Sequence, residues 1–212
     1  MPTGLIIVLV LYGLAFLIGE LAYHGGIDSN ITRKIIHIGG GAVTAFLPFL
    51  VSFRTALALT AFFIVFIFLS ERYKFFHSIH NINWQSRGAL LFPVSVLASI
   101  LLFWELSPIV FSGAMLILGL SDGFASLLGR AWGRHHYFIT AEKTYEGSLI
   151  FFIITLAIFS VFLIIKGSVG FFPISLALLG TIFLTVIEGV SRNGWDNLFL
   201  PLVGGGFFLL LF

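Results

Sequence analysis

Long apolar runs separated by short polar stretches make up nearly the whole chain of 212 residues. A membrane-spanning helix needs about 20 apolar residues. Eight runs approach that length: Gly4–Ala22, Ile35–Leu50, Thr55–Ser70, Ala89–Trp104, Pro108–Leu128, Ser148–Ile165, Phe172–Val190 and Leu198–Phe212. The second and last runs are short, so a count of seven stays open if one of them is re-entrant. The pattern therefore predicts an all-α, polytopic transmembrane bundle of about eight spans, forming one domain over residues 1–212.

The composition agrees with a membrane environment. Hydrophobic residues make up 59% of the chain and charged residues only 9%, whereas soluble domains carry about 25% charged residues. The chain has no cysteine, which excludes disulfides and thiolate chemistry. A net charge of +2 without a basic block excludes nucleic acid as an expected partner. The first apolar run follows no basic segment, so we interpret it as a retained helix rather than a signal peptide.

The basic residues fall on one side of the predicted topology. If alternate connections lie on opposite sides, nine of the 11 Lys and Arg residues lie on the odd-numbered connections. These nine are Arg33, Lys34, Arg72, Lys74, Arg87, Arg130, Arg134, Lys143 and Arg192. The positive-inside rule makes this side cytoplasmic and puts both termini outside.

The acidic residues follow the same division, with only Glu105 of the nine on the opposite side. The remaining acids are Glu20, Asp28, Glu71, Asp122, Glu142, Glu146, Glu188 and Asp196. Acidic residues contribute little to membrane orientation, so their concentration needs another cause. A polar site on the cytoplasmic face is the simplest one.

The first candidate cluster is Arg33, Lys34 and His37, which open the second apolar run after the capping candidates Ser29 and Asn30. Their spacing of three and four residues puts them on one helical face. Cations at a helix N-terminus oppose the helix dipole, which favours a bound anion. The alternative is a topogenic pair with an interfacial histidine.

The second cluster surrounds Asp122, which follows a long apolar stretch and should lie below the membrane interface. An ionisable residue at that depth is a functional candidate. Ser126, Gly129 and Gly133 continue a stripe of small or polar residues from Asp122. Such a stripe indicates either close helix packing or a groove where a headgroup or nucleotide meets a carboxylate-held metal. We favour the groove.

Two further clusters lie beside the last three apolar runs. Lys143 stands where the free N–H groups of a helix could help to bind phosphate, and Glu146 could ligate a metal or cap that helix. Glu188 ends one apolar run, and Asp196 and Asn197 begin the next. This oxygen-rich set is typical of Mg²⁺ sites, while a plain interfacial turn is the alternative.

The four clusters, in this order, resemble the CTP-dependent lipid-alcohol kinases: dolichol kinase, phytol and farnesol kinases, and the CTP-dependent diacylglycerol kinase. The strongest part is D-G-x-A-x-x-x-G-R-x-x-G from Asp122, followed by K-T-x-E-G-S from Lys143. That part is shared with CDP-diacylglycerol synthase. R-K-x-x-H from Arg33 and E-x(7)-D-N-x-x-x-P from Glu188 point to the kinase branch. The short chain is more similar to the phytol and farnesol type than to dolichol kinase.

The resemblance implies transfer of the γ-phosphate of CTP to the hydroxyl of a membrane lipid alcohol, with Mg²⁺, giving lipid phosphate and CDP. It implies Asp122, Asp196 and Glu146 as metal ligands. The catalytic residues it implies are Asp122, Lys143, Glu146, His37 and Glu188. Nucleotide contacts are implied for Arg33, Lys34, Ser126, Gly129, Arg130, Gly133, Lys143, Thr144 and Asn197. Either His37 or a carboxylate near the metal could orient the hydroxyl.

Two alternatives stay open: a CTP:lipid-phosphate cytidylyltransferase, which would release pyrophosphate, and a membrane carrier whose buried acids bind ions. Against the carrier, the polar residues gather on one face rather than at the midplane. We expect an integral membrane protein with its active site on the cytoplasmic face, in a prokaryotic plasma membrane rather than the endoplasmic reticulum.

Overall fold

The computed structural model describes residues 2–73, 75–80, 87–138, 140 and 143–212. Lys74 and Glu142, which entered the charge argument, lie outside these residues. Helices dominate the described chain, which confirms the all-α prediction. They are α1 (Pro2–His24), α2 (Ser29–Ala45), α3 (Leu47–Leu50), α4 (Phe53–Tyr73), α5 (His77–His80), α6 (Gly88–Phe103), α7 (Pro108–Leu116), the π-helical turn η1 (Ile117–Asp122), α8 (Gly123–Trp132), α9 (Tyr145–Lys166), α10 (Phe171–Val190) and α11 (Asp196–Leu211).

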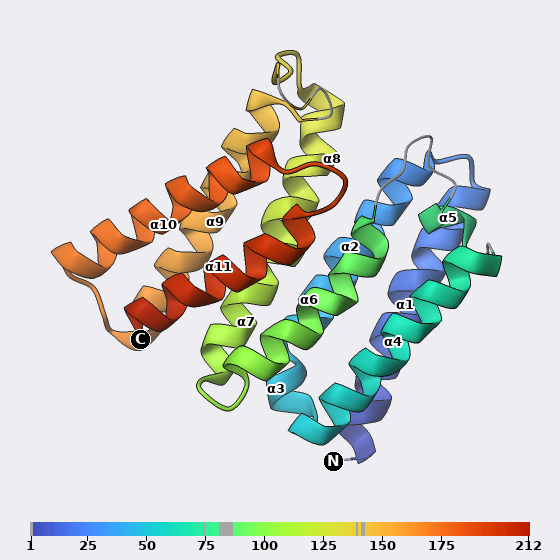
Figure 1. Cartoon of the computed structure of the whole chain (residues 1–212), viewed down its shortest axis with the longest axis horizontal. Coiled ribbons are helices and arrows are strands. Elements are labelled where there is room, and N and C mark those ends of the chain that lie inside the picture. The colour runs from blue at the N-terminus through green and yellow to red at the C-terminus, as the bar shows by residue number, and fades with distance from the viewer. Residues whose placement is uncertain (1, 74, 81–86, 139, 141–142) are drawn as a thin grey trace.

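The long helices run up and down beside one another, and α7, η1 and α8 form one continuous rod (Figure 1). The helix pairs α1–α2, α2–α7, α8–α9, α9–α10, α10–α11, α11–α6 and α6–α4 are in contact. Tyr12 and Phe16 of α1 pack on Phe63 of α4. Together with the α1–α2 and α4–α6 contacts, this groups α1, α2, α4 and α6 in one part of the bundle. Both chain ends lie away from the end of the bundle where α8 meets α9 (Figure 1).

Five helical stretches among the described residues are long and apolar enough to cross a membrane. The rod Pro108–Trp132 is the central one. In its most apolar stretch of 18 residues, 72% of the residues are buried, against 17–33% in the corresponding stretches of the other four helices. Outside it, large apolar side chains such as Phe62, Leu101 and Ile165 are more than half exposed. This is the architecture of an integral membrane protein. Because α6 and α11 have 16 residues each, the count of eight spans and the placement of the termini outside stay predictions.

The N-terminal ends of α2 and α9 lie next to several side chains of the candidate site. Asp28 caps α2 by accepting a hydrogen bond from the Asn30 backbone N–H, so the expected capping by Ser29 or Asn30 was wrong by one or two residues. Both of those residues lie inside the first turn of α2. Thr144 caps α9 by accepting from the Gly147 N–H. Each cap satisfies a backbone donor that the helix leaves free.

The central rod changes its winding just before Asp122. The π-helical turn η1 ends at this residue, and π-turns within α-helices are frequent at functional sites. At the same level α2 approaches the rod backbone to backbone, because a Cβ at Gly41 would collide with the Cα of Gly119. Gly41 therefore serves close packing, and this contact brings Lys34 and His37 within reach of Asp122 at the end of the π-turn.

We predict that Gly41→Ala destabilises the protein by about 1–3 kcal/mol, the usual cost of overpacking a well-packed contact. The added methyl group would force α2 away from η1. Thermal unfolding of the purified protein in detergent measures this effect. Gly206→Ala is the matched control, because a Cβ there meets nothing within 4 Å. Equal unfolding temperatures for the two variants would contradict the close-packing account.

Candidate active site

Asp122 is the most deeply buried acid in the site, with its side chain 0% exposed. Its Oδ2 atom lies 2.6 Å from the Lys34 Nζ and 3.2 Å from the His37 Nε2. The same His37 nitrogen lies 2.8 Å from the Leu118 carbonyl oxygen. Because both of these neighbours are acceptors, Nε2 carries the proton, and a neutral ring keeps its lone pair on Nδ1. The predicted face of α2 is thus turned toward the central rod, where Lys34 and His37 meet the buried Asp122 carboxylate.

Lys143 joins Asp122 to the two carboxylates from the other half of the chain. Its Nζ lies 2.6 Å from Glu188 Oε1, 2.7 Å from Asp196 Oδ2 and 3.7 Å from Asp122 Oδ1. Burial disfavours the charged lysine, but Asp196, Glu188 and Asp122 together raise the pKa of Lys143 well above its ordinary value. The ammonium is therefore charged at neutral pH. The single cation holds three acids at one point.

Hydrogen bonds fix the loop that carries Glu188, Asp196 and Asn197. Ser148 donates to Glu188 Oε2 at 2.7 Å, and the Thr140 hydroxyl donates to the Gly189 carbonyl oxygen at 2.7 Å. The Asn197 side-chain amide donates to the Gly88 carbonyl oxygen at 2.7 Å. The loop is therefore attached both to α9 and to the start of α6.

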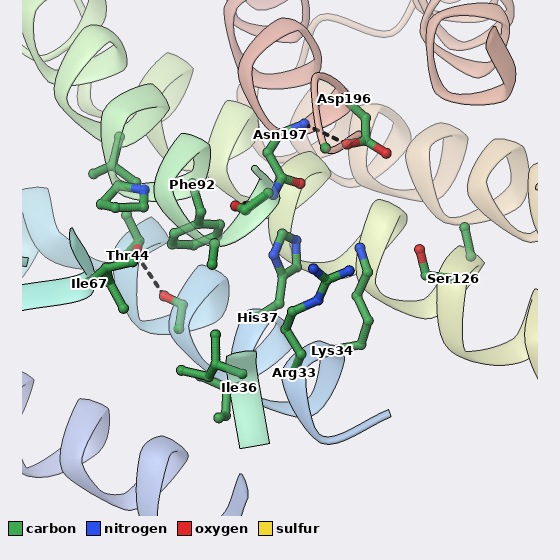
Figure 2. Close-up of a pocket in the computed structure, with 18 of the residues that line it drawn as sticks. Arg33, Lys34, Ile36, His37, Thr44, Ile67, Phe92, Ser126, Asp196 and Asn197 are labelled. Atoms are coloured by element: carbon green, nitrogen blue, oxygen red, sulfur yellow. Dashed lines mark hydrogen bonds between the residues drawn. The ribbon is translucent and has the colours of Figure 1, made fainter. Parts of the chain in front are cut away.

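A cavity of about 150 Å³ opens beside this cluster. Arg33, Lys34 and His37 extend from α2 toward Asn197 and Asp196, while Ile36, Thr44, Ile67 and Phe92 line another part of the same cavity (Figure 2). Its polar end is lined by charged or hydrogen-bonding side chains: Arg33, Lys34, His37, Ser126, Arg130, Lys143, Glu188, Asp196 and Asn197. The remainder is mostly apolar and lies among α1, α2, α4 and α6. The cavity is therefore amphipathic.

The structure brings together most of the site residues predicted from the sequence. Ser126, Gly129 and Thr144 line the cavity. Gly133 is not among the cavity-lining residues, and a Cβ there would collide with the Gly129 carbonyl oxygen and the Thr144 side chain. Its nucleotide contact stays a prediction. The stripe that follows Asp122 thus combines the two expected roles, groove and close packing.

Glu146 takes a different position from the other acids. Its Oε1 lies 2.7 Å from the His135 Nδ1, and both side chains are partly exposed at 32% and 77%. Among the described residues, no ion pair or hydrogen bond joins it to Asp122 or Asp196. Its metal role stays a prediction.

Sequence reasoning missed the apolar half of the cavity, including Tyr12, Thr44, Thr60, Phe63 and Phe92. Tyr12, Thr44 and Thr60 were the available signal, since each is a polar residue within an apolar run. Which helices meet around them depends on packing between distant segments. The sequence pattern does not report such packing.

The polar end contains oxygen atoms that could hold the predicted Mg²⁺. Within the described part of the chain, no group of three or more His, Cys, Asp or Glu side chains is arranged to hold a metal ion. However, Asp122 Oδ1 and Asn197 Oδ1 are buried and accept no hydrogen bond from any described residue. Buried acceptors without a donor are costly. Mg²⁺ commonly takes one or two carboxylates with water and substrate phosphates, so these oxygens fit it.

A membrane-embedded bundle with charged groups at one end of an amphipathic cavity is suited to a protein that binds a membrane amphiphile. The comparisons with known proteins narrow this class. The chain is 32% identical over 179 residues to a phytol kinase of Synechocystis sp., covering 82% of this chain and 76% of that one. It is 26% identical over 203 residues to a probable chloroplastic phytol kinase 2 of Glycine max (90% and 68%) and 25% identical over 222 residues to a probable chloroplastic phytol kinase of Zea mays (90% and 70%).

The chain therefore belongs to the phytol kinase family and is a lipid-alcohol kinase. This confirms the kinase branch over the cytidylyltransferase and carrier alternatives. No protein-family model matches the chain. No solved structure matches it either.

We predict that Lys143→Met destabilises the protein by about 3–5 kcal/mol, because removing one partner leaves buried carboxylates without compensation. The measurement is unfolding in detergent with divalent cations chelated, so that no metal replaces the lysine. Lys166→Met, at the exposed end of α9, is the control and should change stability little. If the two variants unfold alike, Lys143 does not hold the carboxylates together.

Proposed function

We propose that this protein transfers the terminal phosphoryl group of CTP to the hydroxyl of an isoprenoid alcohol of the phytol type. The observation that carries the proposal is the amphipathic cavity, whose cationic and carboxylate end continues into an apolar end. Such a cavity suits a polar reacting group on a hydrocarbon chain. The names of the relatives support phytol as the alcohol, and CTP rests on the family resemblance.

Phosphoryl transfer requires alignment of the reactants and compensation of negative charge. Arg33, Lys34, Lys143 and Arg130 surround the polar end and would bind the phosphates of the nucleotide. The alcohol oxygen forms a bond to the terminal phosphorus while the bond from that phosphorus to the bridging oxygen breaks, and CDP leaves. The alcohol proton must then pass to an acceptor. His37 can accept it at Nδ1, since its Nε2 is occupied by Leu118 and Asp122.

Asp122 and Asp196, with Asn197, would hold Mg²⁺. When bound, Mg²⁺ supplies charge compensation on the triphosphate. Lys143 shares these carboxylates, and its long flexible side chain can contact phosphate once the nucleotide enters. Glu188 receives hydrogen bonds from both Lys143 and Ser148, so its role would be to position Lys143.

We place the protein in a prokaryotic plasma membrane as part of this proposal, and the distribution of basic residues supports a site on the cytoplasmic face. Both termini would then lie outside.

Product analysis tests the proposal directly. Purified protein would be incubated with Mg²⁺, γ-labelled CTP or ATP, and phytol, geranylgeraniol, farnesol, a long polyprenol, diacylglycerol or phosphatidate. We expect label on a phytol-type alcohol together with release of CDP. Pyrophosphate release with phosphatidate, or no turnover with any pair by folded protein, would overturn the proposal.

We predict that Asp122→Asn lowers kcat at least about 100-fold, as loss of a group that organises charge at a reacting centre does. The protein should remain folded by size-exclusion chromatography and thermal unfolding. Glu71→Gln makes the same kind of change at an exposed position of α4 and should keep full activity. Retained turnover in a folded Asp122→Asn variant would remove Asp122 from the site.

A further inference from the structure

The apolar end of the cavity has a defined depth. Along α2 the cavity is lined from Arg33 to Thr44. The seven steps from His37 to Thr44 correspond to a rise of about 10 Å along the helix. On α1, α4 and α6 its lining includes Tyr12, Thr60 and Val96, and the Tyr12 hydroxyl lies 2.7 Å from Thr44 Oγ1. We call this part of the cavity the apolar arm.

The walls of the arm offer no free hydrogen-bond donor from their hydroxyl groups. The Thr44 hydroxyl donates to the Gly40 carbonyl oxygen at 2.6 Å. Since threonine has one hydroxyl proton, the Tyr12 hydroxyl must donate to Thr44 Oγ1, 2.7 Å away. The Thr60 hydroxyl donates to the Ala56 carbonyl oxygen at 2.8 Å. A polar ligand entering the arm would lose its hydrogen bonds to water and gain none from these hydroxyl groups, which costs free energy. The arm therefore favours hydrocarbon ligands over polar ones.

The junction of the two ends is marked by His37 and Phe92, whose rings pack edge to face with centroids 4.8 Å apart. The hydrocarbon tail of a ligand whose polar group lies at the polar end would therefore pass Phe92 and enter the arm. At the arm's deeper level, Tyr12 packs on Phe63 at 4.8 Å. An amphiphile with its hydroxyl at His37 would be surrounded by apolar side chains from its first carbons onward.

We propose that the apolar arm binds the leading isoprene units of the alcohol, and that Gly40 sets how much tail the arm accepts. This inference rests on the proposed function. Gly40 is buried, lines the arm, and has space in front of it, because an added Cβ would lie 3.8 Å from the Tyr12 ring as its nearest neighbour. A methyl group there would make only ordinary van der Waals contact with the Tyr12 ring, so it narrows the arm without displacing its walls. An alanine also suits a helix better than glycine, so Gly40→Ala should fold normally.

The test compares Gly40→Ala with Gly13→Ala, a change on the neighbouring α1 where a Cβ meets nothing within 4 Å. We expect Gly40→Ala to lower kcat/KM for phytol by roughly tenfold, in the range that one methyl-sized change causes in an apolar pocket. The KM for the nucleotide should not change. Gly13→Ala should match the wild type in all constants. Unchanged phytol kinetics in Gly40→Ala would overturn the proposal.

A second measurement is independent of turnover. A phytol analogue with a diazirine in its leading isoprene unit would be photolysed on the protein, and the labelled peptides identified by mass spectrometry. We expect labelling of the segments of α4 and α6 that line the arm, reduced several-fold in Gly40→Ala. Labelling confined to outward-facing positions such as Phe62 would exclude the arm.

The two readouts separate the two proposals. Arm labelling without phosphorylation of any alcohol would reject the proposed function and retain the arm. If the protein phosphorylates the alcohol, but Gly40→Ala leaves the kinetics unaltered and labelling falls outside the arm, the proposed function is retained and the arm is rejected.

Discussion

The site depends on the compensation of three carboxylates buried at one end of a membrane bundle. Asp122, Glu188 and Asp196 are all less than 10% exposed, and buried charges are tolerated only when they are paired. Lys143 contacts all three carboxylates, and Lys34 is a second cation that contacts Asp122. Because these residues come from α2, the central rod, the loop before α9, and α10 and α11, the charge cluster links the halves of the chain. Lys34, Lys143, Glu188 and Asp196 line the cavity in which a nucleotide and an alcohol could meet, and Asp122 lies beside it against the two lysines.

The backbone makes this cluster possible. The π-turn ends at Asp122, and the contact of Gly41 with Gly119 lets α2 lie close enough for Lys34 and His37 to reach it. In the other half, hydrogen bonds from Ser148 and Thr140 hold the ends of α9 and α10 together. Each link is short and local. Together these contacts direct polar groups toward one end of a cavity whose other end is lined mostly by apolar side chains.

Much of the site could be predicted from the sequence, because its signals are local. The three- and four-residue spacing in Arg33, Lys34 and His37 fixes a helical face, and the apolar stretch before Asp122 indicates burial. Lys143 as the common partner of Glu188 and Asp196 could not be predicted, since it depends on how α9, α10 and α11 pack. For the same reason the pairing of Glu146 with His135 was not expected. The π-turn and the apolar arm also lie beyond pattern reasoning, because apolar periodicity does not report which faces meet.

The central claim is that the carboxylates of Asp122 and Asp196 serve a divalent cation in addition to Lys143. Electron paramagnetic resonance with Mn²⁺ in place of Mg²⁺, in the presence of CTP, measures this most directly. The account predicts a bound Mn²⁺ signal in the wild type that is lost in Asp122→Asn and in Asp196→Asn. Bound Mn²⁺ that persists in both folded variants would contradict it and would leave these acids the role of holding Lys34 and Lys143.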